Sequence, residues 1–257
     1  MTLVATLKFS GKLPKGGYLP SECEDHFAID EDSSKFAMAD GATEASYSGI
    51  WARILVESFR EFDSSLMIPG EVETQFDSWL GRCRATWIDW EGSLNKDGLP
   101  WFASEKLLSG SAATFIGVSF ESLPSPASDQ LSCKAVALGD SCLFIVRDNW
   151  LRECFPIDNA SNFGPTPALV RTLSYPIGDN LQVFSSVAID GERVYLTTDA
   201  LGKWFLELCE RGEEPWKLLD SVSTPPDFEN LVEVHRANRS LRDDDTSLIA
   251  IEIKAET

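Results

Sequence analysis

Apolar residues recur along this chain with two different periods. Two early stretches, 50–62 and 76–90, carry large apolar side chains at helical spacing, among them Trp51, Phe59 and Trp87. These stripes predict two helices whose aromatic faces belong to the core, and residues 203–210 predict a third. Nine short segments are instead apolar and rich in β-branched or aromatic residues, which predicts strands: 2–9, 26–29, 36–39, 113–120, 134–138, 142–147, 181–188, 193–198 and 246–253.

Segments rich in glycine, proline and polar residues separate these elements. Residues 12–20 and 159–166 predict loops, and the proline-containing stretch 222–227 predicts a connector. Two helices, a run of strands, a third helix and a last strand favour an α+β fold in which helices cover sheets. No internal repeat or long linker divides the sequence, so we expect one domain over residues 1–257.

Composition places the chain among globular proteins. It has 257 residues, of which 43% are hydrophobic, enough for a sizeable core. No apolar run is long enough to span a bilayer, and residues 1–11 lack the apolar stretch of a secretory signal. We therefore expect a soluble, cytoplasmic protein.

The net charge of −19 argues against two classes of partner. Nucleic acids and anionic membranes would be repelled by so acidic a surface. Part of the acidity is clustered, at residues 22–25 and 243–245, where bound cations could offset it, and the rest fits a solubility role. The six cysteines contain no Cys-x-x-Cys pair, so we expect no zinc site of the usual spacing and mostly buried, reduced thiols.

The segment 36–44 is the first candidate site. An apolar run ends at Asp40-Gly41, so the carboxylate of Asp40 can face a cleft at the end of a strand. Gly41 leaves its own carbonyl free of side-chain cover. Two such oxygens suit a hard divalent cation, although Asp-Gly is also a common turn dipeptide.

Similar acidic turns recur at three later strand ends. They contain Asp140, Asp199 and the run from Asp243 to Asp245. If the strands are neighbours, these carboxylates converge and repel, so either their pKa values rise or cations bind between them. Oxygen ligands without a His or Cys set favour Mg²⁺ or Mn²⁺. For Asp140 a purely structural turn is an equal alternative.

The order of these motifs resembles the metal-dependent Ser/Thr protein phosphatases of the type 2C (PPM) family. The matching segments are Glu24-Asp25, "ADG" at 39–41, "GSAAT" at 110–114, "GDS" at 139–141, "TTDA" at 197–200 and "DDDT" at 243–246. Weaker matches are "IDN" at 157–159 and "YPIGD" at 175–179. The resemblance spans residues 22–251, and its strength lies in six motifs occurring in the right order.

The resemblance implies a four-layer α-β-β-α sandwich, with two antiparallel sheets flanked by helices. It also implies a binuclear Mn²⁺ or Mg²⁺ centre, with a third, weaker ion in many members, that activates water to hydrolyse phosphoserine or phosphothreonine in proteins. Carried over by position, Asp40 bridges the two ions and Asp199 and Asp243 hold one of them. The Gly41 carbonyl and, through water, Glu24 hold the other. Asp25 is a ligand or orients one, and Asp140 contacts the third ion.

The chain also departs from the family pattern. Many members carry an arginine that grips phosphate four residues before the glutamate, where this chain has Pro20. Lys15, or Lys12, is the candidate replacement. The later Asp-Gly becomes Asp199-Ala200, which is tolerable only if the backbone there avoids positive φ. The histidine that follows Asp-Gly in eukaryotic members is absent, and His26 is either a proton donor or structural.

These features favour a Mn²⁺- or Mg²⁺-dependent protein phosphatase, with a phosphoprotein substrate and a Ser/Thr kinase or its targets as partners. The resemblance also makes the flap at 159–171 shorter than usual, which predicts an open cleft contacted by substrate. The alternative is a catalytically weak or inactive type 2C-fold pseudophosphatase that acts as a regulatory binding module. A third possibility is an acidic globular protein whose Asp-rich turns bind stray cations.

Overall fold

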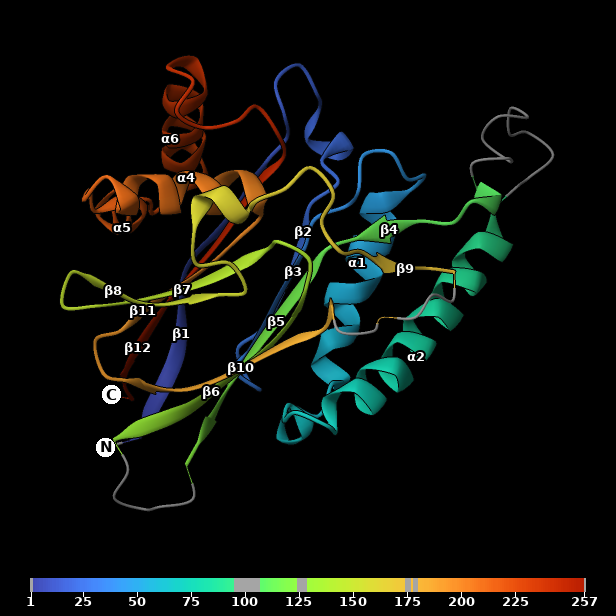
Figure 1. Ribbon diagram of the computed structural model, residues 1–257, viewed down its shortest axis with the longest axis horizontal. Coiled ribbons are helices and arrows are strands. Elements are labelled where there is room, and N and C mark those ends of the chain that lie inside the picture. The colour runs from blue at the N-terminus through green and yellow to red at the C-terminus, as the bar shows by residue number, and fades with distance from the viewer. Residues whose placement is uncertain (1, 95–106, 124–128, 174–176, 178–179, 257) are drawn as a thin grey trace.

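The computed structural model describes residues 2–94, 107–123, 129–173, 177 and 180–256. Two five-stranded antiparallel sheets form its centre (Figure 1). The first has the strand order β1 (Leu3–Leu13), β12 (Thr246–Ala255), β11 (Arg193–Thr197), β7 (Cys142–Arg147), β8 (Trp150–Phe155). The second has the order β10 (Gln182–Ile189), β6 (Gln130–Leu138), β5 (Phe115–Ser122), β3 (Lys35–Ala39), β2 (His26–Asp30). Strands β4 (Ala112–Ala113) and β9 (Val170–Arg171) form a separate short ribbon.

Helices cover the outer face of each sheet. Helices α1 (Ser48–Ser58) and α2 (Val72–Ser93) pack on the second sheet. Helices α4 (Asp199–Glu210), α5 (Pro215–Asp220) and α6 (Pro225–Ala237) pack on the first. Figure 1 shows the two sheets between these helical layers. The predicted α-β-β-α sandwich is therefore confirmed.

The alternation of side chains along β3 shows how the layers meet. Phe36 and Met38 point into the apolar layer between the sheets. Ala37 and Ala39 point the other way, into the aromatic cluster beneath α1 and α2. Successive side chains of β3 thus alternate between the two sides, which is the pattern of a strand that is buried on both faces.

Helices α5 and α6, which the sequence pattern did not predict, complete the helical layer on the first sheet. The predicted connector at 222–227 is wrong from Pro225 onward, where α6 begins. Thr224 caps this helix by accepting a hydrogen bond from the Asp227 amide, while the Asp227 carboxylate accepts one from the Thr224 amide. Proline fits the first helical turn because no amide donor is needed there, so it starts this helix and does not break it.

Other expectations hold or shift at the boundaries. Strand β1, predicted at residues 2–9, extends to Leu13 and lies at the edge of its sheet. Helix α4 begins at Asp199, four residues before the predicted start. All six cysteines are free thiols and four of them are buried. Within the described residues, no helix is both long and apolar enough to cross a bilayer.

Candidate metal centre

Strand register brings the acidic turns to one end of the two sheets. Thr197 on β11 pairs with Cys142 on β7 and with Leu248 on β12, so the turns holding Asp140, Asp199 and residues 243–245 are neighbours. On the other sheet His26 pairs with Ala39, which brings Asp25 beside Asp40. The convergence expected from the sequence therefore arises from antiparallel pairing.

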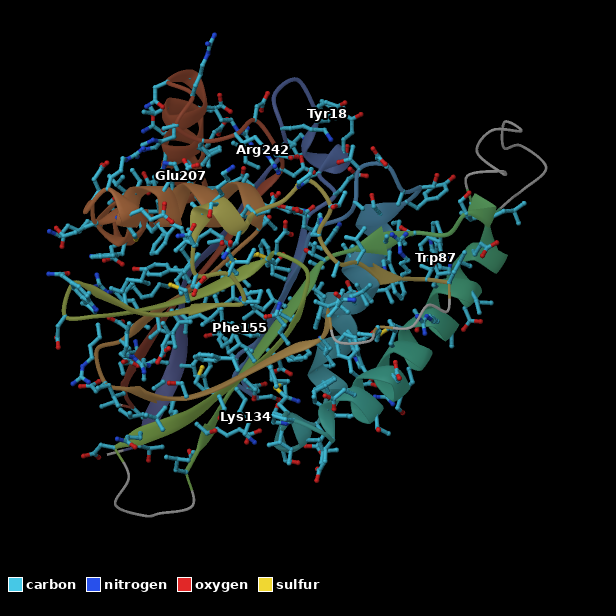
Figure 2. All side chains as sticks on the ribbon, viewed as in Figure 1. Tyr18, Trp87, Lys134, Phe155, Glu207 and Arg242 are labelled. Carbon is cyan, nitrogen blue, oxygen red and sulfur yellow. The ribbon has the colours of Figure 1, made fainter. Side chains whose placement is uncertain are left out.

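A cavity of about 630 Å³ opens at this end of the molecule. Four aspartates line it: Asp40, Asp140, Asp199 and Asp244. The rest of its lining includes Gly41 to Ala45, Ser109 to Ala112, Gly164 to Pro167, Arg171 and Arg242. Figure 2 shows Arg242 at this edge, near the loop that carries Tyr18. Of the predicted site residues, Asp40, Gly41, Asp140 and Asp199 lie on the cavity wall.

Asp40 is held in place by hydrogen bonds to Thr114, which lies between β4 and β5. Its carbonyl accepts a hydrogen bond from the Thr114 amide at 2.8 Å, and its own amide donates to Thr114 Oγ1 at 3.4 Å. Gly41 leaves no room for a side chain, because a Cβ there would lie 2.9 Å from the Glu24 carbonyl oxygen and from Ser48. The Asp-Gly pair is thus fixed by packing as well as by backbone pairing with residues 112–114.

Asp25 is fully buried and half satisfied. Its Oδ2 accepts hydrogen bonds from Thr198 Oγ1 at 2.9 Å and from Ser247 Oγ at 2.8 Å. Its Oδ1 has no hydrogen-bond partner among the described residues. A buried carboxylate oxygen without a donor is costly, so this atom points to a missing positive group.

Asp140 and Asp199 show the same deficit. The Oδ1 atom of each is buried and unpartnered within the described part of the chain. Asp140 follows Gly139, whose φ of +114° and whose close approach to Thr114 and the Ala168 carbonyl admit only glycine. Asp199 is the first residue of α4, and Ala200 follows in helical conformation, so the absence of glycine there causes no strain.

The electrostatics agree with this geometry. Burial raises the pKa of Asp25 and of Asp140 to about 7. Burial and then the neighbouring charges of Asp25, Asp199, Asp140 and Asp244 hold the pKa of Asp40 well above its ordinary value. Desolvation with mutual repulsion disfavours the charged carboxylates, and a divalent cation between them would reverse both effects.

The carboxylates nevertheless do not form a finished cage. Across the ranges that the structure describes, no three His, Cys, Asp or Glu side chains stand close enough together to hold an ion without rearrangement. Two of the cavity aspartates, Asp199 and Asp244, are instead turned onto Arg242. The unpartnered oxygens and the raised pKa values fit a cation site whose ligands have still to close, and they do not fit a carboxylate cluster that is complete on its own.

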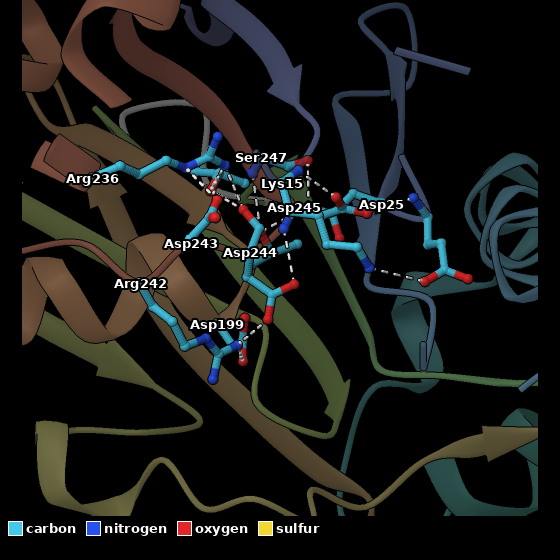
Figure 3. Close-up of polar contacts among 12 residues, drawn as sticks. Lys15, Asp25, Asp199, Arg236, Arg242, Asp243, Asp244, Asp245 and Ser247 are labelled. Atoms are coloured by element: carbon cyan, nitrogen blue, oxygen red, sulfur yellow. Dashed lines mark hydrogen bonds and ion pairs between the residues drawn. The ribbon is translucent and has the colours of Figure 1, made fainter. Parts of the chain in front are cut away.

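The three consecutive aspartates before β12 have three different contacts (Figure 3). Asp243 is 62% exposed, accepts a hydrogen bond from the Gly16 amide at 2.7 Å and lies 3.7 Å from Arg236. Asp244 lines the cavity and contacts Arg242 at 2.7 Å. Asp245 is buried and accepts from the Lys15 and Glu24 amides at 2.8 and 2.7 Å. The Asp243 side chain, predicted as a metal ligand, therefore points away from the cavity, and among these three aspartates it is Asp244 whose side chain lines the cavity wall.

Lys15 also lies outside the cavity wall. Its Nζ is 4.0 Å from Glu24 Oε2 and 4.6 Å from the centre of the Tyr18 ring. Glu24 in turn accepts a hydrogen bond from Ser48 Oγ. The Lys15 ammonium therefore neutralises Glu24, and the prediction that it grips substrate phosphate is not supported. Lys12 donates to the Asp25 carbonyl and is likewise engaged.

His26 has the properties of a structural histidine. Burial, then the charges of Lys12 and Arg53, lower its pKa to about 4. A neutral imidazole with so low a pKa is a poor proton donor near neutral pH. Of the weak motif at 175–179 only Ile177 belongs to the described residues, so the rest of that prediction lies outside them.

Sequence reasoning missed two arginines on the cavity wall, Arg171 and Arg242. Neither belongs to a recognisable motif, and each stands in a segment without periodicity, so no sequence signal marked them. It also missed the hydroxyl groups that support the acids. Thr198 and Ser247 hold Asp25, and the Thr114 hydroxyl lies 2.8 Å from that of Ser141. The polar ends of the predicted strands were the available signal for these hydroxyls.

The sequence matches no protein-family model and no curated protein sequence. Solved structures do match. The catalytic domain of the Ser/Thr protein phosphatase PstP in complex with two manganese ions superimposes with a TM-score of 0.61 at 15% identity, covering 99% of this chain and 100% of that one. PppA from Pseudomonas aeruginosa gives 0.61 at 17% identity, covering 98% and 100%. The PPM Ser/Thr phosphatase MsPP from Mycobacterium smegmatis, in complex with cacodylate, gives 0.56 at 15%, covering 96% and 99%. This chain therefore has the fold of the PPM-type Ser/Thr protein phosphatases, over nearly its full length.

Proposed function

We propose that this chain is a Mn²⁺- or Mg²⁺-dependent phosphatase that hydrolyses phosphoserine or phosphothreonine in proteins. The observation that carries the proposal is the set of buried, unpartnered carboxylate oxygens on Asp25, Asp140 and Asp199, gathered around Asp40. The fold of PPM-type phosphatases supports it. The substrate is then a phosphoprotein, and a Ser/Thr kinase or its targets are the expected partners.

The candidate cation ligands are the acidic residues that line the cavity. Asp40, Asp199 and Asp244, with the Gly41 carbonyl, are the oxygens that would hold two ions, and Asp140 is placed to contact a third. Glu24 and Asp25 stand behind them, where a carboxylate can orient a ligand or bind through water. When bound, such ions neutralise phosphate oxygens and lower the pKa of a coordinated water.

The chain's own side chains supply the rest of the site. Arg171 and Arg242 bring positive charge to the cavity where the substrate's phosphate would lie. Residues 164–167 form part of its wall, in the flap segment expected to contact substrate. Burial raises the pKa of every cysteine thiol, to about 12 for Cys23, which disfavours the thiolate, and no cysteine lines the cavity. The proposed reaction therefore gives the cysteines no part.

The test is metal-dependent hydrolysis by the purified chain. An aryl phosphate and a phosphothreonine peptide are offered with Mn²⁺, with Mg²⁺ and with a chelator, to the parent and to Asp40→Asn. Turnover that needs the metal and falls by at least about a thousandfold in Asp40→Asn supports the proposal. Tight metal binding without turnover would establish the pseudophosphatase alternative, and weak binding indifferent to Asp40→Asn would leave only an acidic protein that binds stray cations.

A further inference from the structure

One arginine occupies the middle of the acidic cavity. Nη2 of Arg242 contacts Oδ2 of Asp199 and lies 2.7 Å from Oδ2 of Asp244 (Figure 3). Asp199 stands at the start of α4 and Asp244 in the turn before β12, so one guanidinium joins the two structural elements that flank the first sheet's acidic end. A single positive group thus holds two of the four cavity aspartates.

This contact only partly satisfies the acids. Oδ1 of Asp199 stays buried and unpartnered while Oδ2 is bound to Arg242. Asp140, on the same wall, keeps its own unpartnered Oδ1. One guanidinium carries one charge, whereas four aspartates line the cavity. Arg242 therefore makes the acidic cluster tolerable without making it complete.

Arg242 is also free to leave, unlike the neighbouring arginine. Its side chain is 53% exposed, and within the described residues its guanidinium makes ion pairs with those two carboxylates alone. Arg236 is 7% exposed and is anchored by the Pro14 and Asp244 carbonyls and by the Thr246 hydroxyl. Arg236 fixes the backbone of the acidic turn. The Arg242 guanidinium, in the described part of the chain, contacts only side chains, and a stronger cation can replace these contacts without moving the backbone.

We propose that Arg242 is an internal counter-cation that competes with the divalent ion for Asp199 and Asp244, and so sets the metal concentration that the site requires. The inference rests on the proposed metal centre and concerns binding of the metal only. An ion entering the cavity has to displace the guanidinium before both carboxylates can turn to it. The apparent affinity of the site for the divalent ion is reduced by the fraction of molecules in which Arg242 has released the two carboxylates.

The test is a calorimetric titration of the metal-free chain with MnCl₂, without any substrate. Arg242→Gln removes the competing charge and keeps a polar side chain, and it should bind Mn²⁺ about tenfold more tightly than the parent. The matched control is Arg171→Gln, which removes an equal charge from the wall of the same cavity without touching Asp199 or Asp244. Its Mn²⁺ affinity should stay within about twofold of the parent.

Thermal unfolding gives a second readout. Metal-free Arg242→Gln should melt below the parent, because Asp199 and Asp244 lose their cation, and saturating Mn²⁺ should raise its melting temperature by more than it raises that of the parent. If Arg242→Gln fails to fold without metal, Arg242→Lys replaces it in the titration. The Lys variant keeps the charge but has no planar fork to join two carboxylates, so it should bind Mn²⁺ more tightly than the parent.

Three results would overturn the inference. They are unchanged or weaker Mn²⁺ binding in Arg242→Gln, an equal gain in Arg171→Gln, and weaker binding in Arg242→Lys where that variant is needed. An equal gain in both Gln variants would show that only the net charge of the cavity matters. Absence of phosphatase activity would count against the proposed function and would leave these binding results standing.

Discussion

The apolar layer between the two sheets and the acidic end of the same sheets differ in completeness. Between the sheets, Ile116, Leu196 and Ile251 are almost wholly excluded from solvent and belong to one cluster of apolar side chains. At the acidic end, Asp140 and Asp199 each have a buried carboxylate oxygen with no partner in the described chain. The first region is completed by its own packing, whereas the second keeps buried carboxylate oxygens that the described residues leave without a hydrogen-bond donor.

The two regions are joined by the same strands, since the acidic residues follow directly after buried strand ends. Strand β3 is buried from Phe36 to Ala39, and Asp40 is the next residue. Strand β11 ends at the buried Thr197, two residues before Asp199. Unfavourable acidity is thus confined to the residues just past the ends of well-packed strands. The core therefore supplies the stability that holds the acidic end in place, so mutation should mainly lower stability in the core and mainly lower activity at the acidic end.

The largest effect on stability should come from the apolar core, in the aromatic cluster beneath α1 and α2 on the outer face of the second sheet. The Phe115 ring packs against Trp79, Phe59 and Phe76, with centroids 5.0, 5.7 and 6.2 Å away. Phe115→Ala should lower the free energy of unfolding by about 3–5 kcal/mol, because it leaves a cavity in a rigid cluster. Urea unfolding with and without Mn²⁺ measures this loss. The exposed Val187→Ala is the control and should change stability by less than about 0.5 kcal/mol. A loss below about 1 kcal/mol in Phe115→Ala would mean that this cluster is not rigid.

On the acidic side, two adjacent residues form a matched pair. Asp244→Asn should lower kcat/KM for an aryl phosphate by about a hundredfold to a thousandfold, equivalent to about 3–4 kcal/mol, because Asp244 faces the cavity. Asp243→Asn should stay within about threefold, because that side chain faces Gly16 and solvent. Steady-state kinetics at saturating Mn²⁺ compares the two. The reverse order of losses would restore the ligand assignment made from the sequence.

The metal-free protein should lose stability as pH rises. Burial raises the folded-state pKa of Asp25 and Asp140 to about 7, above the ordinary 3.8. A raised carboxyl pKa contributes stability that is fully present below the unfolded pKa and is lost as pH rises through the folded pKa. Between about pH 6.5 and pH 8.5 the loss should be on the order of 1.5 kcal/mol. His26, whose folded pKa is lowered to about 4 from the ordinary 6.5, adds a smaller opposite trend of about 0.4 kcal/mol at the lower edge of this window.

Urea unfolding at the two pH values, in chelator and then in saturating Mn²⁺, measures this dependence. In chelator, Asp140→Asn should lose less stability between the two pH values than the parent does, because one of the two titrating groups is gone. Bound metal should flatten the slope, since it favours the charged carboxylates. A metal-free stability that rises across this window would contradict the electrostatic account of the acidic end.

The fold could be predicted from the sequence because its signals are periodic. The stripe that includes Trp79 and Trp87 marks α2, and alternating isoleucines mark β12. Helix α6 was missed because Pro225 is as compatible with a first helical turn as with a connector. Where local chemistry permits two structures, only packing decides between them.

The acidic residues could be located to a turn but not always to a side chain. Asp40 and Asp140 each stand alone after an apolar strand, so no choice was needed. At residues 243–245 three aspartates are adjacent, and a shift by one residue reverses the direction of a side chain. The hydrogen bonds that Asp243 accepts from Gly16 and Asp245 accepts from Lys15 leave Asp244 as the side chain that faces the cavity. Those partners lie more than 220 residues away in the chain, where no local pattern can reveal them.

The smallest predicted effect concerns the cavity's other arginine and the route of the substrate. Arg171 lies on β9, paired with Ala112, and its carbonyl accepts a hydrogen bond from Arg84 at 3.2 Å, so its backbone is fixed. Val170 before it is buried, so Arg171 points the opposite way, along the cavity wall. Its guanidinium makes no hydrogen bond or ion pair with the described residues, in contrast to Arg242, and it is available to a substrate.

Arg171→Gln should therefore raise KM for a phosphothreonine peptide by about fivefold, equivalent to about 1 kcal/mol, with kcat within about twofold. A KM effect alone is expected because Arg171 has no contact with the aspartates that would hold the ions. Arg82→Gln, on the exposed face of α2, is the control and should change neither constant. If Arg171→Gln instead lowers kcat as strongly as Asp244→Asn does, the arginine belongs to the acidic end, and the contrast between a free arginine and a bound one would have to be given up.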